Sequence, residues 1–447
     1  MNRLPPLGSL ARNALSLMAT TGLTSVLGLA FWLVAARRYS TESVGRSSAE
    51  IAGATLVATL AALNIGAVLT RLLPAAGIRT RWFVLRCYLV TIGLAVLIGL
   101  GAMALGLGTS FLGDSFAERA AFVVAGVLLL VFTLQDGVLI GLRRSPVVLV
   151  ENGAFAAVKL LALVLLASAL PDNGIVVAWV GPVAVAVLIV TVYLFTVVIP
   201  EHEKAADGGA ELPPRSRVVS FVSAEYAKSV LSTGTTWVLP LLVTAQLGSV
   251  QEAYFWIPWL INYSAVQLPY GISAAYVVES AFEGEQSHRT LKQSLRIGAG
   301  VVALCMFAEF FIVPLLLHLA GPGYAENGTA VIRILALALP FSAMNALYGT
   351  FAWMEQRMWR LVMLQVANVL VLITGSWLFM DDWGINAVAI WYLISQMVLG
   401  LGSLPPIMRR LRAASERSSQ LVTTEVVPGP GGAATVDVLA VDDSRLP

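Results

Sequence analysis

The stretch NGIVVAWVGPVAVAVLIVTVYLFTVVIP, Asn173 to Pro200, decides the fold class of this chain because it carries no acidic or basic side chain. A second uncharged stretch, CYLVTIGLAVLIGLGAMALGLGTSFLG, covers Cys87 to Gly113. A helix needs about 20 apolar residues to cross the hydrocarbon core of a bilayer. Both stretches therefore predict membrane-spanning helices.

The composition of the whole chain extends this prediction. Of its 447 residues, 58 % are hydrophobic and only 12 % are charged, against roughly 45–50 % and about 25 % in soluble domains. Soluble enzymes, secreted disulfide scaffolds and disordered chains are excluded. The net charge of +2 is too small to indicate a nucleic-acid partner. Cys87 and Cys305 lie in apolar stretches, where thiols pack as small hydrophobic groups.

Hydropathy and turn residues predict an all-α polytopic membrane protein with twelve transmembrane helices. The first apolar run, of about 24 residues, is too long for the apolar region of a signal peptide, which has about 7–15, so we interpret it as a span. The predicted spans cover residues 13–36, 47–70, 84–108, 118–142, 147–170, 174–199, 219–247, 252–278, 295–319, 328–353, 359–380 and 385–408.

The basic residues predict the orientation of these spans. With the amino terminus in the cytoplasm, four of the 28 basic residues fall in outward-facing loops and three fall inside spans, which leaves 21 on the cytoplasmic side. Loops rich in lysine and arginine stay in the cytoplasm. We therefore expect a multi-pass plasma-membrane protein with both termini cytoplasmic.

A weak internal repeat divides the spans into two lobes of six. The pattern Thr-Gly-x-Thr-x-x-Leu occurs in the first span at residues 21–27 and in the seventh at residues 233–239. Parallel repeats of this kind enclose a central cavity that opens alternately to either side of the membrane. The predicted organisation is an amino-terminal lobe (1–200), a cytoplasmic linker (201–217), a carboxy-terminal lobe (218–412) and a disordered cytoplasmic tail (413–447).

Four segments together resemble one family of transporters. They are FWLVAARRYSTESVG (31–45), LNIGAVLTRLLPAAG (63–77), LQDGVLIGLRRSPVVLVENGAFAAVKLLALVLL (134–166) and FMDDWGINAVAIWYLISQ (379–396). Over about residues 8–412 the chain resembles the Wzx-type polysaccharide and O-antigen flippases of the multidrug/oligosaccharidyl-lipid/polysaccharide exporter (MOP) superfamily. The resemblance rests on pattern over the whole chain rather than on one diagnostic motif.

This resemblance implies a bacterial flippase that works by alternating access. Its cargo would be an undecaprenyl-diphosphate-linked oligosaccharide for cell-surface polysaccharide biosynthesis. A polysaccharide polymerase would be a possible partner, and proton or sodium coupling a possible energy source. No cofactor is implied. A cousin in the same superfamily, a cation-coupled exporter of small molecules, stays open as an alternative.

Basic side chains at membrane depth are costly and are usually functional. The predicted substrate-binding cations are Lys159, Lys228, Arg71 and Arg333, which would neutralise a diphosphate or acidic sugars. Structural alternatives exist for each of them. Lys159 could pair with Asp136 or Glu151, and Lys228 with Glu225. Arg333 could reach the interface or pair with Glu309, and Arg71 could bind the phosphate of a membrane lipid.

Acidic, amide and aromatic residues complete the predicted site. Asp136 and Glu225 are the candidates for ion coupling. Asn64 and Gln365, with Trp237, would hold sugar, although hydrogen bonds between helices and aromatic packing are the usual roles of such residues. Further amides and aromatic residues at depth are Gln135, Gln267, Asn345, Asn368, Gln396, Trp256, Trp259 and Tyr270.

Enzymatic motifs are missing from the sequence. It contains no Walker A run, HExxH or CxxC, so we predict neither catalytic residues nor a metal site. A membrane glycosyltransferase would need large outer loops or an acidic site, and Asp381-Asp382 alone is weak support. Between the two transport functions, the lysine at mid-membrane favours the flippase over a cation exporter.

Overall fold

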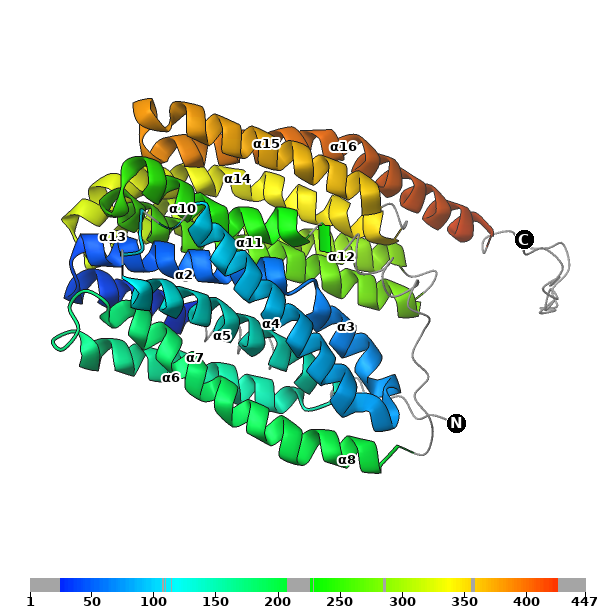
Figure 1. Ribbon diagram of the computed structural model, residues 1–447. Helices are drawn as coiled ribbons and strands as arrows, with labels where there is room; N and C mark the ends of the chain where they lie inside the picture. Colours follow the sequence, from blue (N-terminus) through cyan, green and yellow to red (C-terminus); the bar gives the residue numbers. More distant parts are fainter. Residues whose placement is uncertain are drawn as a thin grey trace, which may run out of the picture.

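The structure is a computed structural model that describes residues 25–106, 108, 110–113, 115–206, 226–227, 229–283, 287–354 and 358–424. Within these ranges the chain is helical, with turns between the helices and no strand. The helices run side by side as one elongated bundle (Figure 1). The predicted all-helical membrane fold is confirmed.

Twelve helical segments are found in the described ranges when adjoining helices are counted together, and each overlaps one predicted span. Nine of them are long and apolar enough to cross a membrane, or ten when the bent pair α2–α3 is included. They are a helix over residues 25–38, α2 (Thr41–Ala61) with α3 (Ile65–Leu72), α4 (Thr80–Ala104), α5 (Phe116–Gly141), α6 (Ser145–Leu166), α7 (Gly174–Tyr193) with η3 (Leu194–Val198) and α8 (Ile199–Lys204), η4 (Val230–Gly234) with α10 (Thr235–Leu247), α11 (Ser249–Glu283), α12 (Ser287–Phe307) with η6 (Ala308–Ile312) and α13 (Val313–Ala320), α14 (Pro322–Met354), α15 (Met358–Trp383) and α16 (Ile385–Thr424).

The second span differs from its prediction as one continuous helix over 47–70. Helix α2 starts earlier, at Thr41, because the Ser40 hydroxyl accepts a hydrogen bond from the Ser43 amide and caps its first turn. The chain then breaks at Leu63 and Asn64, which both have positive φ angles. The helix that follows is bent by 50°. The span therefore consists of two helices.

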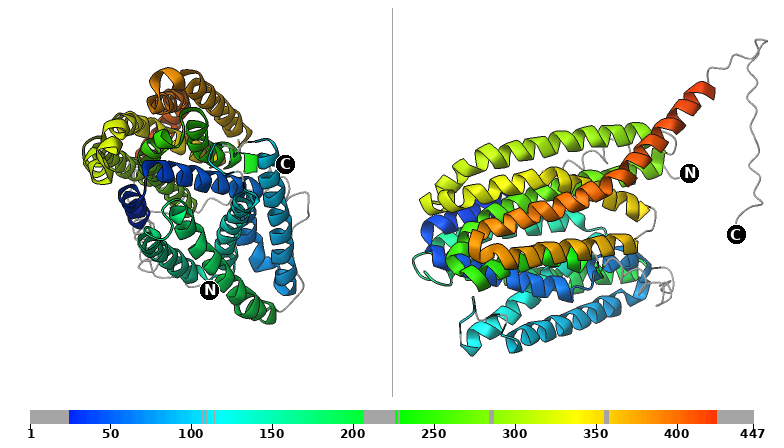
Figure 2. Two further views of the ribbon diagram at one scale, coloured as in Figure 1. Left: turned by 60° about the vertical axis from the view of Figure 1, so that its left-hand side comes forward. Right: turned by 90° about the horizontal axis from the view of Figure 1, so that it is seen from above.

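The last helix also extends beyond its predicted limit. Helix α16 continues to Thr424 and projects from the bundle (Figure 2, right). Residues 413–424 are therefore helical, although the sequence predicts disorder from 413 onward. Pro405 and Pro406 lie inside this helix without ending it.

Each lobe has a hydrophobic core of its own, and a third core is shared. The first is built from α2, α3, α4, α5, α7 and η3, and the second from α10, α11, α14, α15 and α16. The shared core joins residues 31–39 and α2 to α11, α13 and α14. Figure 1 shows the lobes one above the other, with α2 of the amino-terminal lobe lying against α10 and α11 of the carboxy-terminal lobe.

The two lobes meet tightly at the end of the bundle where α2 and α11 begin, which we call the closed end. A Cβ on Gly45 would lie 1.6 Å from the Ser249 carbonyl oxygen, so only glycine permits this approach of the two helices. Beside it, the Ser48 hydroxyl donates to Glu252 Oε1 at 3.4 Å. Trp32 packs edge-on against Trp256 with ring centroids 5.3 Å apart. The lobes are therefore closed against each other here.

Candidate functional site

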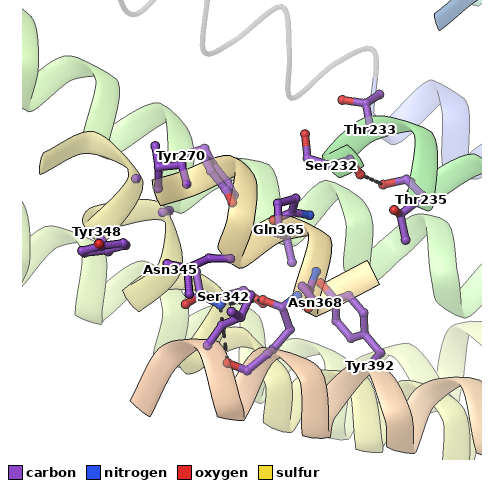
Figure 3. A pocket seen from close by; sticks show the side chains of 18 of the residues that line it. Ser232, Thr233, Thr235, Tyr270, Ser342, Asn345, Tyr348, Gln365, Asn368 and Tyr392 are labelled. Carbon is purple, nitrogen blue, oxygen red and sulfur yellow. Dashed lines mark hydrogen bonds between the residues drawn. The ribbon is translucent and has the colours of Figure 1, made fainter. Parts of the chain in front are cut away.

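A cavity of about 570 Å³ lies in the carboxy-terminal lobe. Its walls come from η4, α10, α11, α14, α15 and α16 (Figure 3). Tyr348 lies near the last turn of α14 and Leu361 near the first turn of α15. These turns are at the end of the bundle opposite the closed end, so the cavity lies in that half of the lobe.

Amides and hydroxyls from α14 and α16 form a connected network in the wall. The Asn345 amide donates to Gln396 Oε1 at 2.8 Å, and the Ser342 hydroxyl donates to the same oxygen at 3.3 Å. The Ser403 hydroxyl donates to Asn345 Oδ1 at 3.3 Å. On α15, the buried Asn368 Oδ1 has no hydrogen-bond partner. The wall therefore holds its polar groups in place and keeps one acceptor free.

Aromatic rings form another part of the wall. Trp259 and Tyr392 meet at right angles with ring centroids 5.3 Å apart. The Trp259 indole NH donates to the Thr236 carbonyl at 3.1 Å, which fixes the ring. Tyr263, Tyr270 and Tyr348 add further rings. Such rings provide flat apolar surfaces with a polar edge.

The described residues that line the cavity carry no formal charge. They are Ser232, Thr233, Thr235, Thr236, Trp259, Tyr263, Val266, Gln267, Tyr270, Ser342, Asn345, Ala346, Tyr348, Gly349, Thr350, Leu361, Leu364, Gln365, Asn368, Leu372, Tyr392, Gln396, Leu399 and Ser403. Ser232 and Thr233 belong to the π-helix η4. A single π-turn inside a longer helix frequently marks a functional site.

Lys159 lies away from this cavity, in the other lobe. Its ammonium is 3.7 Å from the Trp179 ring centroid, 4.7 Å from that of Phe155 and 5.5 Å from that of Phe31. The side chain is buried, and the structure forms neither of the ion pairs that the sequence suggests for it, because both carboxylate oxygens of Glu151 and Oδ1 of Asp136 are without partners. An aromatic box surrounds this cation. Contact between Lys159 and substrate stays a prediction.

The predicted arginines lie on the surface. Arg333 donates its Nε hydrogen to the Phe310 carbonyl at 3.4 Å and covers the Phe310 ring at 5.2 Å. The predicted alternative pairing with Glu309 does not form, because Glu309 instead accepts hydrogen bonds from the Asn262 amide at 3.1 and 3.4 Å. Arg71 is exposed at the end of α3.

The remaining predicted residues fall in three places. Gln365 lines the cavity. Asn64 lies at the break between α2 and α3. Trp237 packs between Trp256 and Tyr263, with ring centroids 6.3 and 6.0 Å away, and the described lining does not include it.

Of the two predicted coupling residues, one lies in the described part of the chain. Asp136 lies on α5 in the amino-terminal lobe, where its Oδ1 is buried without a hydrogen-bond partner. Glu225 and Lys228 lie outside the described residues. Of the predicted cations and acids that the structure describes, none lies in the cavity.

The spacing of several lining residues along the sequence indicates that they share one face of a helix. On α11, residues 259, 263, 267 and 270 recur at helical spacing, which places them on one face. Ser342, Asn345 and Tyr348 on α14 follow the same rule, as do Tyr392, Gln396 and Ser403 on α16. Of these, the amides, Trp259 and Tyr270 are predicted from the sequence as groups at membrane depth, whereas Tyr263, Tyr348, Tyr392 and the two serines are not. No group of three or more residues that could hold a metal ion is found among the described residues.

Solved structures reveal the same fold, while no protein-family profile and no curated protein sequence matches the chain. A multidrug resistance MATE family transporter of the MOP superfamily, in its inward-facing conformation, aligns over 90 % of this chain and 99 % of its own, with TM-score 0.60 and 13 % identity. The MATE multidrug transporter DinF-BH aligns over 90 % of this chain and 96 % of its own, with TM-score 0.61 and 13 % identity.

A third structure with this fold is a MOP superfamily transporter from Pyrococcus furiosus, described by the reverse polarity of its binding pocket. It aligns over 91 % of this chain and 96 % of its own, with TM-score 0.54 and 11 % identity. The chain therefore has the fold of the MATE transporters. At these identities the likeness establishes the fold alone.

Proposed function

We propose that this protein is a membrane exporter that moves a small, uncharged and hydrogen-bonding compound by alternating access. The observation that carries the proposal is the cavity in the carboxy-terminal lobe. Its volume of about 570 Å³ lies within the roughly 300–1,000 Å³ typical of small-molecule sites. Its mixture of amides, hydroxyls and aromatic rings suits a compound with both a flat apolar part and polar groups.

The fold supports transport as the activity. Two of the structures with this fold are described as multidrug transporters. With the orientation that the basic residues predict, the closed end faces outward and the cavity lies in the cytoplasmic half. A compound would enter there, and the lobes would then part at the closed end to release it.

The flippase that the sequence resemblance implies is the second candidate. The amide and aromatic lining would suit sugar. A lipid diphosphate, however, calls for cations, and the described lining residues provide none. In the sequence, Lys159 favours a flippase over an exporter. In the structure it lies in an aromatic box instead of the cavity, so it no longer supports the flippase. The exporter is therefore the better-supported function.

A transport assay in inverted membrane vesicles tests this proposal. The probe is methylumbelliferyl glucoside, an uncharged aromatic glycoside, and an organic cation of the rhodamine class serves as the comparison. Vesicles containing the protein should accumulate the glucoside. Gln396→Leu should lower the uptake at least tenfold, because it removes the acceptor shared by Asn345 and Ser342, at a cost of about 1.4 kcal/mol for each factor of ten.

The matched control is Gln246→Leu, since that amide binds the Trp377 carbonyl and Asp381 outside the cavity. Uptake should stay near the wild-type value in this variant. Uptake of the rhodamine alone would contradict the uncharged substrate class. If neither probe moves and deletion of the gene abolishes surface polysaccharide, the flippase would replace the exporter.

A further inference from the structure

A basic surface lies around the start of helix α4, outside the cavity. Residues 51–113 contain no acidic residue, and their four arginines, Arg71, Arg79, Arg81 and Arg86, all fall within 16 positions. All four side chains are exposed. The stretch runs from the end of α3 through two short 3₁₀ helices into α4, which begins beside α8 at the end of the bundle opposite the closed end (Figure 1). Positive charge is therefore concentrated on one surface of the amino-terminal lobe.

An apolar exposed side of α4 begins at the same place. Ile78, Trp82, Leu85, Leu89 and Leu97 are all exposed, and Trp82 and Leu89 are 55 % and 70 % exposed. Their spacing of three, four or eight residues places them on one side of the helix. This helix is long and apolar enough to cross a membrane, so its exposed side faces lipid. Tryptophan is enriched at the level of the lipid headgroups, which is the level where the arginines lie.

The Arg86 side chain is directed toward this level. Its guanidinium lies over the Trp82 ring, 4.9 Å from the ring centroid. Trp82 is one turn nearer the start of α4, so the Arg86 side chain runs back toward Arg79, the residue that precedes the helix. Long basic side chains reach the membrane interface in this way while their stems cover apolar surface. The ring contact therefore brings the charge of Arg86 closer to the position of Arg79.

Acidic side chains of the described residues do not neutralise these two arginines. The nearby acids lie on α8, where Glu201 pairs with Arg144 and Glu203 accepts a hydrogen bond from a backbone amide of α4. Among the described residues, neither Arg79 nor Arg86 forms a salt bridge. Cations at the start of a helix do not stabilise it either, because that end already carries partial positive charge. An anion from outside the chain would complement them.

We propose that Arg79, Trp82 and Arg86 form a binding site for the headgroup of an anionic phospholipid, whose acyl chains lie along the apolar side of α4. Guanidinium groups suit phosphate because they can donate two parallel hydrogen bonds to its oxygens. With the orientation that the basic residues predict, the lipid belongs to the cytoplasmic leaflet, whose anionic lipids attract basic segments. The site lies outside the cavity, so it is independent of the proposed exporter.

Native mass spectrometry of the purified full-length protein tests this site. The protein in detergent is mixed with equal amounts of palmitoyl-oleoyl phosphatidylglycerol and palmitoyl-oleoyl phosphatidylcholine, which share their acyl chains and differ in net charge. We expect the wild type to retain at least threefold more phosphatidylglycerol than phosphatidylcholine. Arg79→Gln and Arg86→Gln should each lower this ratio at least twofold, because each removes one of the two guanidinium groups. Both side chains are exposed, so these variants should fold.

The matched control is Arg38→Gln, which removes an exposed arginine at the closed end and changes the net charge by the same amount. This variant should keep the wild-type ratio of the two lipids. A second measurement separates the lipid from a free anion. Phosphatidylglycerol should raise the unfolding temperature of the wild type more than phosphatidylcholine does, whereas inorganic phosphate without lipid should leave it unchanged.

The outcomes do not depend on whether the glucoside is transported. A lipid ratio that falls in the Arg79 and Arg86 variants and stays high in the Arg38 variant supports the site. Equal retention of both lipids by the wild type would overturn it, as would an equal fall in all three variants, which indicates diffuse attraction. Stabilisation by inorganic phosphate as large as that by phosphatidylglycerol would also overturn it, because the ligand would then be a free anion.

Discussion

At the scale of single residues, Lys159 illustrates how a buried cation is kept inside a membrane protein. Three rings surround its ammonium, and the closest centroid is 3.7 Å away. Aromatic faces carry partial negative charge, and a desolvated cation over such a face gains about 2 kcal/mol. The box therefore compensates part of the cost of burial without a carboxylate.

Replacement of Lys159 by methionine tests whether this side chain only packs in the aromatic box or also contacts the substrate. Met keeps the length of the side chain and fills the box with an apolar group. The loss of the cation–π attraction is offset because no charge has to be buried. We expect a folded variant with an unfolding temperature close to that of the wild type and with glucoside uptake preserved. A folded variant without uptake would instead support the predicted contact between Lys159 and substrate.

A second residue-scale prediction concerns Asn262 and Glu309. Glu309 is buried on the π-helix η6, and the Asn262 amide donates to both of its carboxylate oxygens. Asn262→Leu removes this donor, and leaving a buried polar group without its hydrogen-bond partner costs about 1–3 kcal/mol. The variant should unfold several degrees below the wild type in a thermal-shift assay.

The control for this variant is Asn327→Leu. The Asn327 amide donates to the Gly323 carbonyl of its own helix, so its removal leaves no carboxylate unpaired. A loss of stability in Asn327→Leu equal to that in Asn262→Leu would show that Glu309 does not need its donor.

At the scale of helices, the packing of α2 on α11 depends on Gly45. A Cβ there would meet the Ser249 backbone, which cannot move aside as a side chain can. Gly45→Ala should separate the helices and destabilise the protein by about 1–3 kcal/mol, as overpacking does. Thermal unfolding measures the loss.

Gly93→Ala serves as the comparison, because a Cβ on Gly93 meets nothing within 4 Å. In the middle of helix α4 this change should be neutral or stabilising, since alanine favours a helix by about 1 kcal/mol over glycine. If both variants lost the same stability, close approach at Gly45 would not be the reason.

The helices were largely predictable because hydropathy reports burial in lipid directly. The uncharged stretch from Asn173 to Pro200 is helical from Gly174 onward through α7, η3 and the start of α8. The break at Leu63 and Asn64 was not predictable, because neither residue is a glycine or proline and apolar residues continue on both sides. The π-turns η3, η4 and η6 likewise lack a sequence signal, since they arise from tertiary packing.

The site was less predictable than the helices, for a physical reason. Charged residues stand out in an apolar sequence, so Lys159 and Arg333 attract attention, yet both are satisfied by neighbouring aromatic rings. The lining depends on ordinary amides and tyrosines, whose position around the helix decides their role. The spacing of residues along one helix predicts which of them share a face. Only the fold shows which faces of different helices come together around the cavity.

At the scale of the whole molecule, the proposed transport cycle requires the closed end to open. Ser48 on α2 and Glu252 on α11 lie in hydrogen-bond contact across it. A protein with Ser48→Cys and Glu252→Cys, in a background with Cys87 and Cys305 replaced by alanine, can be joined by a short thiol-reactive crosslinker. We expect crosslinking to abolish glucoside uptake and a reductant that cleaves the linker to restore it.

A crosslink within one lobe is the matched control. Gln246→Cys and Asp381→Cys join α10 to α15, where the native side chains are 3.1 Å apart, and both belong to the carboxy-terminal lobe. Uptake should survive this crosslink. Uptake that also survives the link across the closed end would mean that the lobes need not separate there.

The uncharged lining of the cavity has an electrical consequence. If the compound in the cavity is neutral and its export is coupled to a proton or a sodium ion, that cation alone carries charge through the cycle, and every turnover produces a current. The membrane potential then contributes about 2.3 kcal/mol per charge for each 100 mV. Current recordings from reconstituted protein on a supported bilayer should show a transient when the glucoside is added, and Asp136→Asn, which changes the predicted coupling residue, should remove it. Export of a neutral compound would thus be driven by voltage as well as by the ion gradient.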